Sequence, residues 1–154
     1  MTKSVYIHIP FCEHICNYCA FCKQYYNKDV VSKYLESLEK EINSLYKGEE
    51  LETIYIGGGT PSVLSKEELI KLFDIIKIFD IEDDIEFTIE GNIESITEDK
   101  LVIMKQNGVN RISVGVQSFN NDVIMLLGRL HNKKEVFSKI ELIKILEELI
   151  ENKI

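Results

Sequence analysis

Hydrophobic residues follow two alternating patterns along this chain. Short runs rich in β-branched and aromatic residues predict strands at residues 4–9, 53–56, 85–90 and 111–117. Apolar residues at helical spacing predict helices at residues 29–46, 65–79, 97–108, 121–127 and 133–151. A capping box, Ser65-Lys-Glu-Glu68, begins the second helix, and Gly108 is a suitable residue to follow the third. The chain therefore repeats a strand–helix unit about four times.

Repeated strand–helix units predict an α/β fold with a parallel sheet. In such sheets ligands bind at the edge formed by the carboxyl ends of the strands. Four groups of polar or glycine residues fall at that edge: a cysteine-rich loop after the first strand, Gly57–Pro61 after the second, Glu90 with Asn92 after the third, and Gln117 after the fourth. We therefore expect one site there.

Composition and charge narrow the class of protein. A chain of 154 residues is sufficient for one domain with a core. Its net charge of −8 argues against nucleic acid or an anionic membrane as the main partner. The sequence contains no apolar run long enough to span a membrane and no signal peptide, so we expect a cytoplasmic protein. In a reducing compartment, clustered cysteines favour metal binding or catalysis over disulfides.

The cysteine loop carries the most specific chemical signal. Cys12, Cys16 and Cys19 form a C-x3-C-x2-C pattern. Three thiolates can hold three irons of a four-iron cluster and leave the fourth iron without a protein ligand. Such an iron can bind and activate another molecule, so the pattern favours a catalytic [4Fe-4S] cluster.

Two other interpretations of the cysteines remain open from spacing alone. A zinc site would need a fourth ligand, which Cys22, His8 or His14 could supply. The thiols could also be buried structural groups, and for Cys22 a packed small hydrophobe is the default expectation.

The other residues at the sheet edge each allow a ligand role and a structural role. Gly57–Pro61 either brings backbone groups close to a ligand or makes a tight turn. Glu90 either binds an ammonium or ribose group or is an exposed strand-end charge. Gln117 either contacts the same ligand or lies in a turn. Arg129, after the helix-breaking Gly128, is a better candidate than Arg111 to bind a carboxylate, and a surface salt bridge is the alternative for both arginines.

The histidines carry less information. His8 is as compatible with a packed core position as with a functional one, and we expect His14 and His131 to be loop or surface residues.

Taken together, these motifs resemble the radical S-adenosylmethionine (radical SAM) enzymes. Within them, the chain is most similar to the group that contains oxygen-independent coproporphyrinogen III oxidase and the haem chaperone. The matching segments are Tyr6-Ile-His-Ile-Pro-Phe-Cys12, Cys16-Asn-Tyr-Cys19, Ile56-Gly-Gly-Gly-Thr-Pro-Ser62, residues 108–119 and Leu127-Gly-Arg-Leu-His131.

The resemblance implies the roles of individual residues. Cys12, Cys16 and Cys19 would bind the cluster, and Gly58, Gly59 and Thr60 would contact the methionyl part of S-adenosylmethionine. Further positions that match the family's cofactor site are Tyr6, Tyr18, Glu90, Gln117 and Arg129. An electron donor such as flavodoxin or ferredoxin would reduce the cluster, and a tetrapyrrole or haem would be the substrate or cargo.

The resemblance also implies a partial TIM-type barrel with more strands than this chain supplies. Residues 1–154 would form a single but incomplete domain, with a last helix at 133–152, an exposed strand edge and an uncovered apolar inner face. That helix or another chain could cover the face. The implied function is oxidoreductase chemistry that cleaves S-adenosylmethionine reductively; the alternatives are a haem chaperone without turnover and a non-functional fragment. Two departures from the family are the position of Cys22 and the absence of a proline after Asn92.

Overall fold

The computed structural model describes residues 3–151, with side chains as far as residue 145. The elements in chain order are β1 (Ser4–Ile9), β2 (Phe11–Cys12), β3 (Gln24–Tyr25), α1 (Lys28–Leu45), β4 (Leu51–Gly58), η1 (Pro61–Val63), α2 (Lys66–Ile76), β5 (Ile81–Asn92), α3 (Glu98–Gln106), β6 (Arg111–Gly115), α4 (Asn121–Leu126) and α5 (Lys133–Glu151). Residue 152, which the sequence assigns to the last helix, lies outside the described residues.

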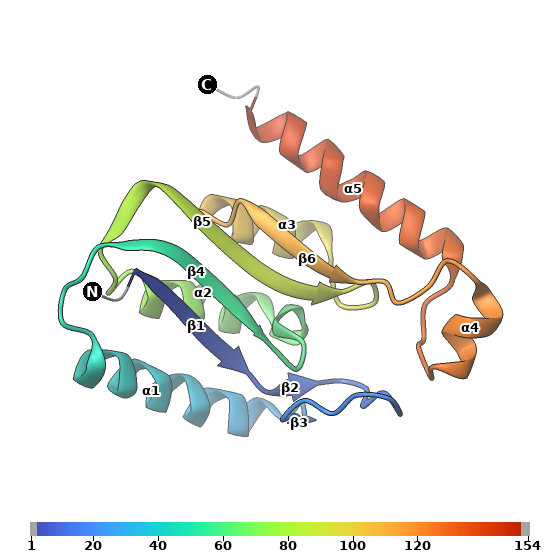
Figure 1. The fold of residues 1–154 in the computed structure, drawn as a ribbon, viewed down its shortest axis with the longest axis horizontal. Coiled ribbons are helices and arrows are strands. Elements are labelled where there is room, and N and C mark those ends of the chain that lie inside the picture. Colours follow the sequence, from blue (N-terminus) through green and yellow to red (C-terminus); the bar gives the residue numbers. More distant parts are fainter. Residues whose placement is uncertain (1–2, 152–154) are drawn as a thin grey trace.

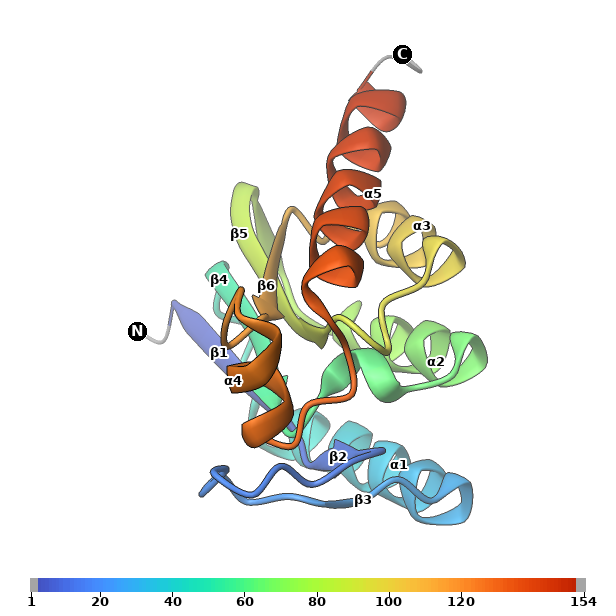
Figure 2. The same cartoon turned by 90° about the vertical axis from the view of Figure 1, so that its right-hand side faces the viewer.

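The main sheet is parallel, with strand order β1-β4-β5-β6, and α1, α2 and α3 cover one of its faces (Figures 1 and 2). The predicted α/β fold is therefore confirmed. Two short strands that the sequence did not predict, β2 and β3, pair beside the end of β1 and close the cysteine loop.

The pairing register explains the core. Ile7, Ile56, Ile89 and Ile112 form one row across the four strands, and the first three are buried. Apolar side chains from the helices, among them Leu35, Leu69, Leu72, Phe73 and Leu101, belong to the same buried cluster. The face of the sheet that the helices cover is thus the hydrophobic face.

The helix ends agree with the sequence. Ser65 and Glu68 form the predicted capping box, with both reciprocal hydrogen bonds present. Gly108 follows α3 with a φ of +89°, as expected for a glycine that ends a helix.

The opposite face of the sheet corrects the expectation of an apolar inner surface. The row next to the isoleucines consists of Tyr6, Tyr55, Thr88 and Arg111. Successive strand residues point to opposite faces, so this row lies on the side away from the helices, together with Glu90 and Ser113. The inner face is therefore largely polar.

The last helix does not cover this polar face. α5 contacts α3 and continues the helical layer beyond β6, as Figure 2 shows. Leu142 and Ile143 of α5 pack against the hydrophobic core.

Candidate functional site

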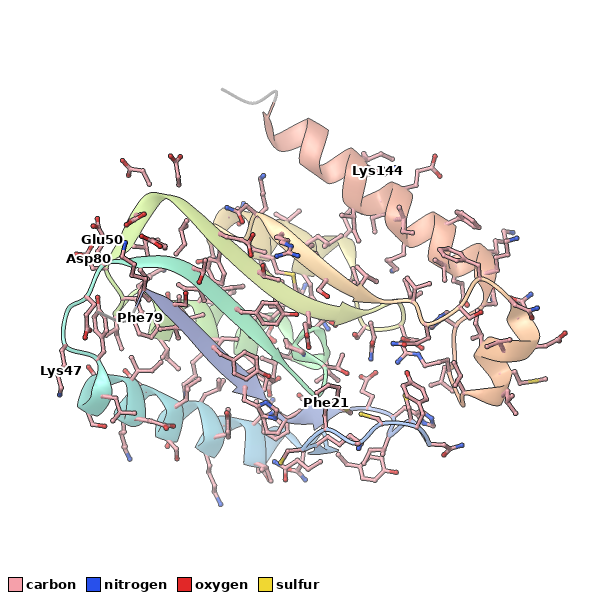
Figure 3. The ribbon with its side chains drawn as sticks, in the orientation of Figure 1. Phe21, Lys47, Glu50, Phe79, Asp80 and Lys144 are labelled. Atoms are coloured by element: carbon pink, nitrogen blue, oxygen red, sulfur yellow. The ribbon has the colours of Figure 1, made fainter. Side chains whose placement is uncertain are left out.

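A cavity of about 330 Å³ lies at the carboxyl ends of the strands, where the sequence placed the site. Phe21, labelled in Figure 3, marks this end of the sheet, and Glu50 and Asp80 mark the opposite end. The residues predicted for the site that line the cavity are Cys12, Cys16, Tyr18, Cys19, Gly58, Gly59, Thr60, Glu90, Gln117 and Arg129. The fold thus brings together residues from the beginning, middle and end of the chain.

The cysteine loop forms one wall of this cavity. Its two ends are joined by the hydrogen bonds Gln24 N–H to Pro10 O (2.7 Å) and Tyr26 N–H to Cys12 O (2.8 Å). Cys12 is buried, and Cys16 and Cys19 are half-buried. Burial raises the pKa of the Cys12 thiol, and the hydroxyl of Thr60, 3.5 Å from the sulfur, partly opposes that rise. A threonine from the glycine loop therefore contacts a predicted ligand directly.

The fourth cysteine behaves differently from the other three. Cys22 is exposed, so the default expectation of a packed small hydrophobe is wrong for it. Its backbone carbonyl accepts a hydrogen bond from His8 Nε2 at 2.9 Å. It does not line the cavity formed by the other cysteines.

The arrangement of the thiols bears on the choice between zinc and a cluster. Within residues 3–145, no three His, Cys, Asp or Glu side chains converge closely enough to hold one metal ion. A tetrahedral zinc ion requires such convergence. Three thiolates that each bind a different iron of a cluster do not, so the choice between zinc and a cluster rests on the cysteine spacing.

The glycine loop forms the wall of the cavity next to Cys12. Gly58 has a φ of +122°, and a Cβ there would lie 2.8 Å from the His8 ring. A Cβ on Gly59 would lie 2.8 Å from Phe11 O and 3.0 Å from Cys12 Sγ. Glycine is needed at both positions because Gly58 packs against the end of β1 and Gly59 against the start of the cysteine loop, contacts that the sequence alone does not reveal.

Glu90 is fixed at the base of the cavity. One carboxylate oxygen accepts a hydrogen bond from Tyr55 OH at 2.6 Å, and the other accepts one from Gly58 N–H at 3.1 Å. The carboxylate is only partly exposed, which argues against a free strand-end charge. Gln117 lines the same cavity with a φ of +66°, which is unusual for a residue other than glycine.

Arg129 is buried at the cavity wall, with its side chain 4% exposed. Its Nη1 lies 3.6 Å from Cys16 Sγ, and its Nη2 donates to Glu94 (3.2 Å) and to Gly115 O (3.0 Å). Burial acts to lower the pKa of Arg129, but the contact with Cys16 and the charge of Glu94 raise it overall. The guanidinium is therefore a fixed positive charge beside the cysteine loop.

Glu94, a partner of this arginine, and His131, a partner of Glu94, were not identified from the sequence. Glu94 binds both Arg129 and His131. His131 lies in the loop before α5, as expected, but it is buried and does not lie at the surface. His131 Nδ1 lies 2.9 Å from Glu94, and its Nε2 lies 3.2 Å from Val116 O. The available signal was a single carboxylate between Ile93 and Ile96, both of which are buried.

Some candidates lie outside the cavity. Tyr6 does not line it; its hydroxyl lies 3.0 Å from His8 Nδ1, so His8 joins Tyr6 to the cysteine loop. Arg111 forms an exposed ion pair with Glu86 at 2.7 Å, the structural role expected for it. His14 is exposed at the cavity mouth.

Comparison with known proteins agrees with this geometry. The model of the Radical SAM superfamily matches residues 6–150. The chain belongs to the radical SAM superfamily. The solved structure of coproporphyrinogen III oxidase from Escherichia coli, itself a radical SAM enzyme, aligns over 93% of this chain with a TM-score of 0.85 and 31% identity. The four-stranded sheet is thus part of a radical SAM partial barrel.

Two relatives indicate the branch within the superfamily. The heme chaperone HemW of Bacillus subtilis is 49% identical over 90% of this chain. Oxygen-independent coproporphyrinogen III oxidase of Escherichia coli is 33% identical over 88% of it. The chain spans 38% and 31% of the length of these two relatives and 34% of the solved oxidase chain. None of the helices in the described part of the chain is long and apolar enough to cross a membrane.

The residues around the cavity fit the cofactors of a radical SAM protein. The donor set is three thiols on one wall, with a carboxylate, an amide and a guanidinium on the others. Arg129 Nε is buried and has no hydrogen-bond partner in the part of the chain that the structure describes. A buried donor left unpaired is costly and indicates a partner that belongs beside it.

Proposed function

We propose that this chain binds a [4Fe-4S] cluster through Cys12, Cys16 and Cys19 and S-adenosylmethionine at the iron without a protein ligand. The observation that carries the proposal is the cavity itself. The three thiols line it together with glycine backbone and polar side chains suited to an amino acid.

The remaining residues would bind and orient S-adenosylmethionine. Gly58, Gly59 and Thr60 line the cavity and would offer backbone groups to the methionyl part. Glu90, already oriented by Tyr55, is suited to an ammonium or a ribose hydroxyl. Arg129 is suited to a carboxylate, and Gln117 and Tyr18 would supply further contacts.

A reduced cluster of this kind, when bound, supplies the electron that cleaves S-adenosylmethionine to methionine and a 5′-deoxyadenosyl radical. The chain's own part is to hold the molecule in one orientation and to limit the access of water to it. The electron would come from a flavodoxin or ferredoxin in the cytoplasm.

A second candidate function is haem handling without turnover. It is favoured by the higher identity to a haem chaperone, 49% against 33% to the oxidase. In either case, residues 1–154 would supply the site for the cluster and S-adenosylmethionine. A fragment that binds metal without function is the third possibility.

Three measurements distinguish these functions. Anaerobic reconstitution should give about four irons and four sulfides per chain. Dithionite and S-adenosylmethionine should then yield 5′-deoxyadenosine if the chain is an enzyme. A stoichiometric haem titration without that product would favour the chaperone function, and a chain that acquires neither cluster nor haem would overturn both proposals.

A further inference from the structure

Glu94 lies at the centre of a buried group of charges behind the cavity wall. Its side chain is 24% exposed, and it contacts Arg129 and His131, whose side chains are 4% and 1% exposed. It also accepts a hydrogen bond from Leu130 N–H at 3.3 Å. Glu94 does not itself line the 330 Å³ cavity, so any effect on the site acts through its partners.

The contacts of Glu94 help to fix the orientation of the Arg129 guanidinium. Nη2 is occupied by Glu94 and Gly115 O. Nη1 is directed at Cys16, and the buried Nε has no hydrogen-bond partner among the described residues. A guanidinium has five N–H donors in a fixed planar arrangement, so fixing one end fixes the others.

The second oxygen of Glu94 is held just as firmly. His131 binds it through Nδ1, and Val116 O holds the other side of the ring. The carboxylate is therefore fixed between a buried histidine and a buried arginine. It cannot rotate away from Arg129 without breaking both contacts.

We propose that Glu94 is a positioning residue that holds the guanidinium of Arg129 beside Cys16, at the wall of the cavity where S-adenosylmethionine would bind. This inference rests on the proposed function. It assigns a role to a residue that does not line the 330 Å³ cavity. The expected consequence is that loss of Glu94 weakens S-adenosylmethionine binding without removing a residue from the site.

The chain supplies its own control. It contains two arginines, Arg111 and Arg129, and each is paired with a glutamate. The Arg111–Glu86 pair is exposed, with side chains 59% and 53% accessible. Selective ¹⁵N-arginine labelling therefore reports on one buried pair and one exposed pair in the same sample.

The first arm of the test uses the cluster-free chain with reduced thiols. A guanidinium held by a buried carboxylate rotates slowly, so Arg129 should give separate Nη–H signals and Arg111 averaged ones. Glu94→Ala should merge the Arg129 signals, Glu94→Gln should have an intermediate effect, and Glu86→Gln should leave them unchanged. Unchanged Arg129 signals in Glu94→Ala would overturn the proposal.

The second arm uses the anaerobically reconstituted chain and S-adenosylmethionine itself. Its dissociation constant, followed by the EPR change of the reduced cluster, should rise about tenfold or more in Glu94→Ala. It should be unchanged in Glu86→Gln. An equal affinity in Glu94→Ala and the wild type would overturn the role in binding. If the wild type binds no S-adenosylmethionine, the proposed function fails, and the first arm still decides whether Glu94 positions Arg129.

Discussion

Tyr55 and Glu90, on neighbouring strands, form a 2.6 Å hydrogen bond on the polar face of the sheet. The hydrogen bond to Glu90 raises the pKa of the Tyr55 phenol, so the tyrosine remains a donor over the physiological range. Because Gly58 N–H holds the other carboxylate oxygen, Glu90 has one orientation at the base of the cavity. Glu90, which faces S-adenosylmethionine in the proposed function, is thus oriented by Tyr55, a residue that does not line the cavity.

Replacement of Tyr55 by phenylalanine tests this relationship. Tyr55→Phe removes one hydrogen bond and leaves the ring in place. S-adenosylmethionine affinity should fall roughly threefold to tenfold, equivalent to about 0.7–1.4 kcal/mol. The free energy of unfolding should fall by about 1 kcal/mol, the usual value of one hydrogen bond, since the Tyr55 hydroxyl is partly exposed. Tyr25→Phe, at an exposed position of β3, is the matched control and should leave the affinity unchanged.

The cysteines should separate into three ligands and one that is dispensable. Cys12→Ala, Cys16→Ala and Cys19→Ala should each lower the iron content well below the roughly four atoms expected for the wild type. Cys22→Ala should retain the wild-type content, since that thiol is exposed and outside the cavity. Iron and sulfide counts with the visible absorption spectrum measure this, and a loss of iron in Cys22→Ala equal to that in the other three would contradict the assignment.

Glu94 should make the fold sensitive to acid. Burial acts to raise its pKa, but the hydrogen bond from His131 and the charge of Arg129 lower it overall. The ion pair therefore stabilises the fold above the pKa of glutamate in the unfolded chain, about 4.3. That contribution is lost as the pH falls through the lower pKa of the folded protein.

The measurement is the urea midpoint between pH 7 and pH 3. The wild type should lose more stability over this range than Glu94→Gln, in which the titrating group is absent. Glu86→Gln removes an exposed ion pair that contributes little to stability. Its urea midpoint should therefore fall with pH as steeply as that of the wild type. Identical slopes in the wild type and Glu94→Gln would contradict the prediction.

The sequence predicted those features of the fold that depend on residues close together in the chain. Alternation along each strand is local, and it correctly predicted the strands whose isoleucines form the row Ile7, Ile56, Ile89 and Ile112. The polarity of the opposite face was missed, because it depends on the register that aligns Tyr6 with Tyr55 and Thr88. β5 also begins earlier than predicted, at Ile81, because its acidic start lacks apolar alternation.

The sequence predicted the site residues that belong to short motifs. It did not predict the site residues whose role depends on burial in the folded chain. The cysteine spacing and Gly57–Pro61 identified most of the cavity wall. The Glu94–Arg129 contact joins residues 35 positions apart in two loops, and nothing local indicates that His131 is buried beside them. Buried charge pairs of this kind are set by tertiary packing.

Two glycines with positive φ allow backbone strain to be separated from steric conflict. Gly48 has a φ of +88°, and a Cβ added there would meet nothing within 4 Å, whereas at Gly58, with a φ of +122°, the Cβ would lie 2.8 Å from the His8 ring. Gly48→Ala should therefore lower stability by about 1–2 kcal/mol, from strain alone. Gly58→Ala should cost about 3 kcal/mol or more, because the His8 ring must also move.

The His8 ring binds Cys22 O, so Gly58→Ala should also disturb the cysteine loop and lower iron content, which Gly48→Ala should not. Denaturation midpoints and iron counts on the two variants measure both effects, and equal losses of stability would show that strain alone accounts for the glycine at position 58.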